Sequence, residues 1–247
     1  MNISTILLII VIIVLLYIVV RYISTDVNTL SGLSSGTAMT TIASSSLAKS
    51  SSGNNSSNFA YSVWFYVNDW NYRYGEPKVI FGRMGDSSGT DKQPCPSVTM
   101  GPISNNLDIA LSIYPGVDSV SNTTGEGNSA IHHCSVANVP IQKWVNLLIS
   151  VYGRTLDVYL DGKLVKTCVL PGVAKINNDA NVYVTPNGGF SGWTAKFQYY
   201  PNSIDPQTAW NIYQKGYGAS MLSNVFGKYQ IKVSLVENGA DASSLTI

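Results

Sequence analysis

Charged residues are scarce in this sequence of 247 residues: they make up 12% of the chain, about half the usual share of roughly 25%. The 15 lysines and arginines are balanced by 14 acidic residues, which leaves a formal net charge of +1. A protein that binds duplex phosphates needs a basic excess or at least a basic stripe. Neither is visible, so we do not expect nucleic acid as a partner.

Cysteine is equally rare. Cys95, Cys134 and Cys168 are an odd number, so at most one disulfide forms within the chain. Cys95–Cys134 is one candidate pair, although the sequence cannot test the separation that a disulfide needs. Cys168 falls on a predicted strand, where we expect a small buried hydrophobic residue.

Metal-binding patterns are missing as well. His132 and Cys134 share one face of a predicted strand and could supply two ligands, but no second Cys/His cluster completes a tetrahedral zinc site. The D-x-D-x-D-G run of a calcium loop is also absent. We therefore expect no metal and no other cofactor, and we expect solvated charges at the three loop acids Asp69, Asp91 and Asp118.

The sequence lacks the paired carboxylates of a glycosidase, which must flank the scissile bond. Glu76, Glu126 and Glu237 lie far apart, and none has an acidic residue two positions away. Asp157 is close to Asp161, but Asp161 is needed for a turn. In so serine-rich a chain, a serine near a histidine is no evidence for a Ser–His–Asp site. We therefore expect no enzymatic activity.

One long hydrophobic run is present, at the amino terminus. Ile3–Val20 carries no charge, and roughly 20 helical residues span a hydrocarbon core of about 30 Å. A cleaved signal peptide is the alternative, but no basic side chain precedes the run and bulky residues follow it. We predict a transmembrane anchor over residues 1–23, with these spanning side chains: Ile6, Leu7, Leu8, Ile12, Leu15, Leu16 and Val20.

The orientation of this anchor depends on few charges. Arg21 follows the run, and this favours a cytosolic position for the rest of the chain. An outward-facing domain is the alternative, with glycosylation acceptors at Asn54, Asn55 and Asn122. Residues 24–58, rich in Ser, Thr, Gly and Asn, are predicted to form a coil linker, because they cannot bury enough apolar area to offset their chain entropy.

Residues 59–218 have the pattern of an all-β domain, with short apolar runs separated by Gly, Asn and Pro. A short helix is expected where Asp205 can cap it, Pro206 suits its first position and Gly216 can end it. The predicted strands are Phe59–Val67, Lys78–Arg83, Ser97–Gly101, Leu107–Tyr114, Ala130–Val136, Trp144–Tyr152, Thr155–Leu160, Lys163–Leu170, Asn181–Thr185 and Phe190–Tyr200.

The tail, residues 219–247, is predicted to contain a half-buried strand, Lys228–Glu237, because apolar and polar residues alternate there. Asn238 and Gly239 form a turn that leads to a final short strand. The tail either completes the sheet of this domain or pairs with the edge of a neighbouring subunit. We favour pairing within the chain.

The strand that Trp144 opens, followed by the hairpin Tyr159-Leu-Asp161-Gly162, resembles the core meander of concanavalin A-like jelly-roll domains of the laminin-G type. The stretch from Phe190 to Trp193 is similar to the F-x-G strand of that family. The resemblance covers about two-thirds of the chain and implies an antiparallel jelly roll. It fixes no activity, because these folds host lectins, hydrolases and structural modules. The residues that carry it are Trp144, Tyr159, Asp161, Gly162, Phe190 and Gly192.

The order of the segments carries a second resemblance. The anchor, the Ser-rich linker, the jelly roll and the tail Gly227–Gly239 are similar to membrane-anchored capsid-associated proteins of large algal DNA viruses. That resemblance implies a minor capsid protein that tethers an internal viral membrane to the shell, with the lipid bilayer and other capsid proteins as partners. The alternative is a carbohydrate-binding lectin or adhesion protein on a cell or virion surface.

The loop that follows the first predicted strand is the candidate binding site. Aromatic residues alternate there with an amide and an arginine, a composition that suits sugar stacking and is also enriched at protein interfaces. In the alternative, Trp70 folds back onto the sandwich and the tyrosines cover an edge. The candidate partner- or glycan-binding residues are Trp70, Tyr72, Arg73 and Tyr74.

Overall fold

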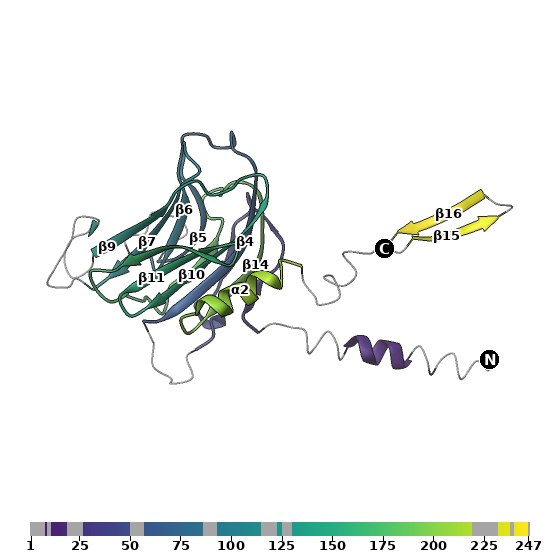
Figure 1. Ribbon diagram of the computed structural model, residues 1–247, viewed down its shortest axis with the longest axis horizontal. Coiled ribbons are helices and arrows are strands. Elements are labelled where there is room, and N and C mark those ends of the chain that lie inside the picture. The colour runs from purple at the N-terminus through teal and green to yellow at the C-terminus, as the bar shows by residue number, and fades with distance from the viewer. Residues whose placement is uncertain are drawn as a thin grey trace. The chain divides into compact units, whose positions relative to one another are not determined.

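The computed structural model describes residues 8, 11–18, 27–49, 57–85, 93–114, 123–124, 130–218, 232–237 and 240–246. They fall into two units, of which one runs from Val27 to Gln214 and the other combines Met1–Asp26 with Lys215–Ile247. In Figure 1 the first unit is a sandwich of two sheets with one short helix beside it. The expected all-β antiparallel sandwich is therefore confirmed.

Sheet A has the strand order β1-β14-β4-β10-β11-β12, and β2 also pairs with β14. The bounds are β1 Thr29–Ser31, β2 Ser34–Ser35, β4 Phe59–Asp69, β10 Trp144–Tyr152, β11 Thr155–Leu160, β12 Lys163–Val169 and β14 Ser191–Tyr200. Sheet B has the order β3-β13-β5-β6-β7-β9-β8. Its strands are β3 Thr40–Ile42, β5 Lys78–Met84, β6 Ser97–Met100, β7 Leu107–Ile113, β8 Thr123–Thr124, β9 Ala130–Val136 and β13 Asn181–Val184. Every one of the predicted strands has its counterpart here.

The core lies between the sheets and follows from the two-residue period of the strands. In β4 the side chains of Tyr61, Val63 and Phe65 point inward and are buried, because alternate residues of a strand share a face. Ile109 and Leu111 of β7 meet them from sheet B. Burial of these faces is the main term that holds the sandwich together.

The hairpin and the helix form as the sequence predicts. Asp161 and Gly162 both adopt positive φ, 49° and 74°, as a type I′ turn between β11 and β12 requires. Helix α2 (Pro206–Gln214) begins after Asp205, whose Oδ1 accepts a hydrogen bond from the Thr208 amide at 3.0 Å. The helix packs Ala209 and Ile212 on the outer face of sheet A.

The predicted coil linker is wrong for its described part, because β1 and β2 pair with β14 and β3 pairs with β13. The chain therefore passes from the edge of sheet A to the edge of sheet B. Gly36 permits this crossing, since a Cβ there would lie 2.6 Å from the Phe190 carbonyl oxygen. Ile42 and Leu47 are buried in the core. The folded unit begins at Val27, not at the predicted residue 59, because edge strands supply backbone partners that composition does not reveal.

The opposite edge of the sandwich is closed by a disulfide between Cys134 of β9 and Cys168 of β12. Their Cα atoms are 6.1 Å apart, a separation that disulfides commonly span. The candidate pair Cys95–Cys134 is therefore wrong, as is the free buried Cys168. Cys95 is the free, buried cysteine. The topology decides this pairing, because it brings β12, the edge strand of sheet A, next to β9, the second strand from the edge of sheet B.

The chain ends form the second unit. There β15 (Lys232–Glu237) and β16 (Ala240–Thr246) pair with each other in a separate two-stranded sheet. Among the described residues the two tail strands pair with each other, whereas we favoured pairing of the tail with the sheet of the domain. The turn at Asn238 and Gly239 lies outside the described residues.

Only part of the predicted anchor is described: residue 8 and residues 11–18 are helical. No helix within the described part of the chain is both long and apolar enough to span a bilayer. The anchor therefore stays a prediction. The predicted spanning residues in the helical part are Leu8, Ile12, Leu15 and Leu16, and those outside the described residues are Ile6, Leu7 and Val20.

Candidate ligand-binding groove

A groove of about 380 Å³ lies on the outer face of sheet B, a volume within the range of roughly 300–1,000 Å³ that small-molecule sites occupy. Strands β5, β6, β7 and β9 form its floor, and their alternate residues face the core. The lining is mainly apolar with a few polar side chains. The lining residues are Pro77, Val79, Pro94, Ser97, Thr99, Met100, Gly101, Pro102, Asp108, Ala110, Ile131 and His133.

A carboxylate–imidazole pair is the main polar feature of the groove. The Nδ1 atom of His133 lies 2.8 Å from Oδ2 of Asp108, and the two side chains are 40% and 43% exposed. Ala110, which stands between His133 and Ser97 across the sheet, is too small to cover them. Ring nitrogen, carboxylate and hydroxyl therefore border one hollow, where they can exchange hydrogen bonds with a ligand's hydroxyl groups.

The predicted binding loop, residues 69–75, lies next to one end of this groove. The amide of Gly75 donates to the carbonyl oxygen of Pro102 at 3.1 Å, and both Pro77 and Pro102 line the groove. The loop and the groove are therefore parts of one surface.

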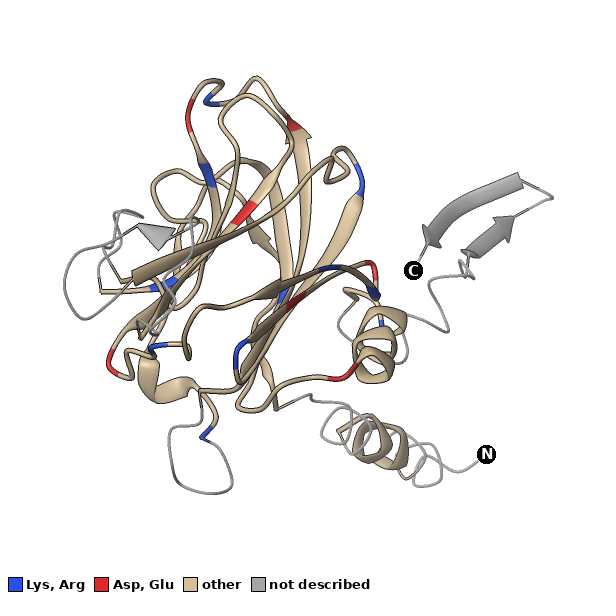
Figure 2. Cartoon of the chain, turned by 60° about the vertical axis from the view of Figure 1, so that its left-hand side comes forward, with Lys and Arg blue, Asp and Glu red and all other residues tan. Residues whose placement is uncertain are grey.

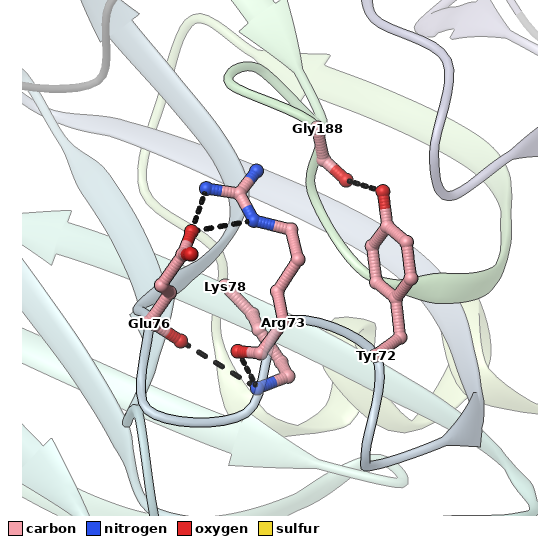
Figure 3. Close-up of polar contacts among 5 residues, drawn as sticks. All are labelled: Tyr72, Arg73, Glu76, Lys78 and Gly188. Carbon is pink, nitrogen blue, oxygen red and sulfur yellow. Dashed lines mark hydrogen bonds and ion pairs between the residues drawn. The ribbon is translucent and has the colours of Figure 1, made fainter.

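Most of the predicted loop side chains are engaged within the protein (Figure 3). Trp70 packs against the core and donates its Nε1–H to the Ile103 carbonyl at 3.2 Å. The hydroxyl of Tyr72 donates to the Gly188 carbonyl at 3.2 Å. Arg73 donates from Nε to Glu76 at 2.9 Å. Tyr74 remains, 59% exposed. Trp70 is therefore folded back onto the sandwich, which was the alternative to a role in binding.

The side chain of Lys78 holds the loop in place through contacts with its backbone and with Trp70. This side chain is fully buried, and Figure 3 shows its Nζ joined to two carbonyl oxygens of the chain, those of Arg73 at 3.1 Å and Glu76 at 3.5 Å. The same ammonium lies 4.6 Å from the ring centroid of Trp70, a favourable cation–π distance. Burial lowers the pKa of Lys78, and the nearby charge of Arg73 lowers it further. The buried Lys78 side chain thus holds the loop against the first residue of β5.

Most of the residues that carried the family resemblance lie where they support the fold, in the interior, in a turn or at a bulge. Tyr159 is buried under α2, Phe190 is buried in the core, and Asp161 accepts the Asn146 amide at 2.9 Å. Gly162 lies against α2, where a Cβ would come within 2.9 Å of two aromatic side chains, and Gly192 lies at a β-bulge. Trp144, by contrast, lies beside Tyr66 on the outer face of sheet A.

The surface to which Trp144 contributes was not predicted from the sequence. Tyr66 lies between Trp144 and Trp193, with ring centroids 5.8 and 5.7 Å away. The only signal was that Trp64 and Tyr66 alternate with core residues on the first predicted strand, and their cross-strand neighbours could not be known.

The predicted strand-face pair His132 and Cys134 does lie on one face, but Cys134 is bonded to Cys168. Among the described residues, no group of three or more His, Cys, Asp or Glu could hold a metal ion. His132 is 8% exposed, and its Nδ1 has no hydrogen-bond partner. Burial, and then the neighbouring His133, lower its pKa below the usual 6.5.

This lowered pKa makes stability depend on pH. As the pH falls through 6.5, the unfolded chain takes up a proton that the folded chain binds only at lower pH, so folding stability falls. We expect the melting temperature to drop between about pH 7.5 and about pH 5.5, and His132→Phe to remove part of that drop. Thermal unfolding at both pH values measures it. Ser135→Ala, on the same strand and without a titratable side chain, is the control and should keep the drop of the wild type. An equal slope in His132→Phe and the wild type would contradict the assignment.

The charges of the sandwich are dispersed. In Figure 2 the Lys and Arg positions alternate with Asp and Glu positions around the described chain, and no cluster of one sign stands out in this view. This distribution agrees with the near-neutral composition.

Comparison with curated proteins finds no match for this chain. Among solved structures, a tryptophan-to-alanine mutant of HCR/D matches with a TM-score of 0.49 at 13% identity, over 74% of this chain and 41% of that one. The receptor-binding domain of botulinum neurotoxin D matches with a TM-score of 0.47 at 13% identity, over 64% and 37%. The botulinum neurotoxin D ligand-binding domain in complex with N-acetylneuraminic acid gives 0.46 and 12%, over 64% and 36%.

The chain thus spans well under half the length of these structures, and the likeness is too weak to assign a ligand. The family comparison is decisive for the fold. Residues 40–212, most of the chain, match the model of the concanavalin A-like lectin/glucanases superfamily. This range contains both sheets from β3 to β14 and nearly all of α2. The chain therefore belongs to the concanavalin A-like lectin/glucanase superfamily.

Proposed function

We propose that the sandwich is a carbohydrate-binding module without catalytic activity, and that the groove on sheet B holds the sugar. The observation that carries the proposal is the Asp108–His133 pair, set in a groove whose other lining is mostly apolar. A sugar presents hydroxyl groups on its rim and C–H groups on its faces. The pair and Ser97 can bind hydroxyls, while Val79 and Ile131 can contact the C–H faces.

The groove favours binding over hydrolysis. A glycosidase places two carboxylates about 5–9.5 Å apart across the bond that it cleaves. Asp108 is the one acidic residue among the described residues that line the groove. Its carboxylate already accepts a hydrogen bond from His133, an arrangement that orients a binding group, and the described lining holds no second carboxylate for the glycosidase pair.

The disulfide supports display outside the cytosol, because disulfides persist in oxidising compartments and are rare in the cytosol. Cys134–Cys168 therefore favours a carbohydrate-binding protein on a cell or virion surface, held there by the predicted anchor. The minor capsid protein between an internal viral membrane and the shell stays a prediction. No observation on the described residues favours it over the surface protein.

Variants of the pair test the proposed function. We expect the full chain to bind members of a glycan array, and Asp108→Asn or His133→Ala to weaken binding about tenfold, because each removes a hydrogen bond to a charged or polar group. Titration calorimetry with the best array ligand measures the change. Ser135→Ala, on the same face of β9 but outside the groove, is the control and keeps full affinity.

Two results would overturn the proposal. Either no glycan binds, or both variants bind as tightly as the wild type does. Release of reducing sugar that stops in Asp108→Asn would instead make the chain a hydrolase.

A further inference from the structure

Four of the five tryptophans of the chain lie on or over the outer face of sheet A, opposite the groove. Helix α2 covers one part of this face, where Tyr213 stacks on Trp64 at 5.6 Å and leaves it only 5% exposed. The remaining part carries Trp193, Tyr66 and Trp144, which we name the aromatic row.

The aromatic row crosses three neighbouring strands, β14, β4 and β10, which are seen side by side in Figure 1. Trp193 and Trp144 are the direct cross-strand partners of Tyr66 on its two sides. The ring centroids follow at steps of 5.7 and 5.8 Å, and the two tryptophan planes are tilted by 54° and 56° from Tyr66. The three rings therefore follow one another across the sheet, with Tyr66 at the centre of the row.

Trp193 is 44% exposed, and Tyr66 and Trp144 are partly buried beside it. The hydrophobic free energy that Trp193 contributes to folding is small for so large a side chain, because nearly half of its surface stays in contact with solvent. Exposed aromatic residues gathered in one place are a mark of a binding surface.

Glycine at position 192 permits this arrangement. The bulge between Ser191 and Gly192 brings β14 against β4, and a Cβ on Gly192 would lie 1.8 Å from the Tyr66 carbonyl oxygen. Its φ of +152° is one that L side chains rarely adopt. Trp193 follows directly and is placed opposite Tyr66.

The charge of the surroundings limits the chemistry of the ligand. None of the three rings carries a charge, and Lys143, which precedes Trp144, is paired with Asp161 at 3.1 Å. Gln142 and Asn68 are exposed beside the row, and the side-chain amide of Gln142 donates to the backbone carbonyl oxygen of Asn68 at 3.4 Å. The surface thus offers aromatic faces bordered by amides and no unpaired ion among these residues. This suits an uncharged ligand with apolar faces and hydroxyl rims.

We propose that the aromatic row is a second carbohydrate-binding surface, which takes an uncharged polysaccharide laid across β14, β4 and β10. Pyranose rings expose C–H faces that stack on aromatic side chains, and their hydroxyls suit the amides of Gln142 and Asn68. Three aromatic rings side by side fit successive sugar units of one polysaccharide rather than a single terminal sugar. This site is independent of the groove on sheet B and stands whether or not the groove binds sugar.

Binding of the full chain to insoluble polysaccharides tests the row. The probes are cellulose and chitin in pull-down assays, with phosphatidylcholine vesicles as a third probe. We expect binding to at least one polysaccharide, a loss of roughly tenfold or more in Trp193→Ala, and near-complete retention in Trp193→Phe, because an aromatic anchor dominates such a contact. The emission of tryptophan should also shift when the polysaccharide binds.

Three controls isolate the contribution of the aromatic row to binding. Tyr152→Ala removes an exposed tyrosine on the same face of β10, outside the row, and should bind as the wild type does. Ser135→Ala, on the outer face of sheet B but outside the groove, should also bind as the wild type does. Trp193 does not line the groove, so failure of the groove proposal would not affect the loss expected in Trp193→Ala. Circular dichroism verifies that each variant is folded. The proposal is overturned if neither polysaccharide binds, if Trp193→Ala binds fully, or if only vesicles bind, which would make the row a membrane-contact surface.

Discussion

The Cys134→Ala/Cys168→Ala double variant is expected to lose about 3–4 kcal/mol of unfolding free energy. The two residues are 34 positions apart, and a cross-link that closes a loop of this size restricts the unfolded chain by about that amount. The bridge also joins β12 at the edge of sheet A to β9 of sheet B, so its loss frees β12, whose side chains are mostly exposed. We expect the melting temperature to fall by roughly 10 °C. Denaturant titration and calorimetry measure the two quantities.

Reducing agent provides the matched comparison. It should destabilise the wild type and Cys95→Ala to the same extent, because Cys95 is not part of the bridge, and it should not affect the double variant. Peptide mapping that finds Cys95 joined to Cys134 would contradict this assignment. So would a double variant as stable as the wild type.

Gly192→Ala should cost on the order of 3 kcal/mol, because it combines backbone strain with a clash against a strand. The added Cβ would lie 1.8 Å from the Tyr66 carbonyl oxygen and 2.9 Å from its carbonyl carbon, so β14 must move away from β4. The change should also displace Trp193 from Tyr66 and alter the near-ultraviolet circular dichroism. Denaturant unfolding gives the free-energy difference.

Gly153→Ala is the control for backbone strain alone. Gly153 has a φ of +56° in the turn between β10 and β11, and nothing lies within 4 Å of its Cβ position. The expected cost is about 1 kcal/mol. Equal losses in the two variants would mean that β14 does not need a glycine for its approach to β4.

The strands of the sandwich were predictable because their patterns are local. Apolar residues at every second position of Phe59–Asp69 define one buried face. Asp161-Gly162 accepts the positive φ values of the turn, and Asp205 caps α2 within three residues. Each of these signals depends on neighbours in the sequence alone. The expected fold followed from them.

The early strands were missed for the opposite reason. Nothing in the composition of residues 29–42 favours a strand, and they form strands because β14 and β13 offer free edges. Backbone pairing at an edge needs little help from side chains. The predicted boundary at residue 59 therefore came more than thirty residues too late.

The candidate sites show the same difference between what local sequence predicts and what only tertiary contacts determine. The sequence by itself determined the scarcity of charge, the strands, the aromatic content of the 69–75 loop and the absence of paired acids along a strand. Only the tertiary structure decided that Trp70 and Tyr72 turn inward, that His133 meets Asp108, that Cys134 joins Cys168, and that three aromatic residues from three strands form one row. The reason is physical. Local periodicity fixes which face of a strand is apolar, whereas the neighbours across that face depend on strand order and register, which long-range packing sets.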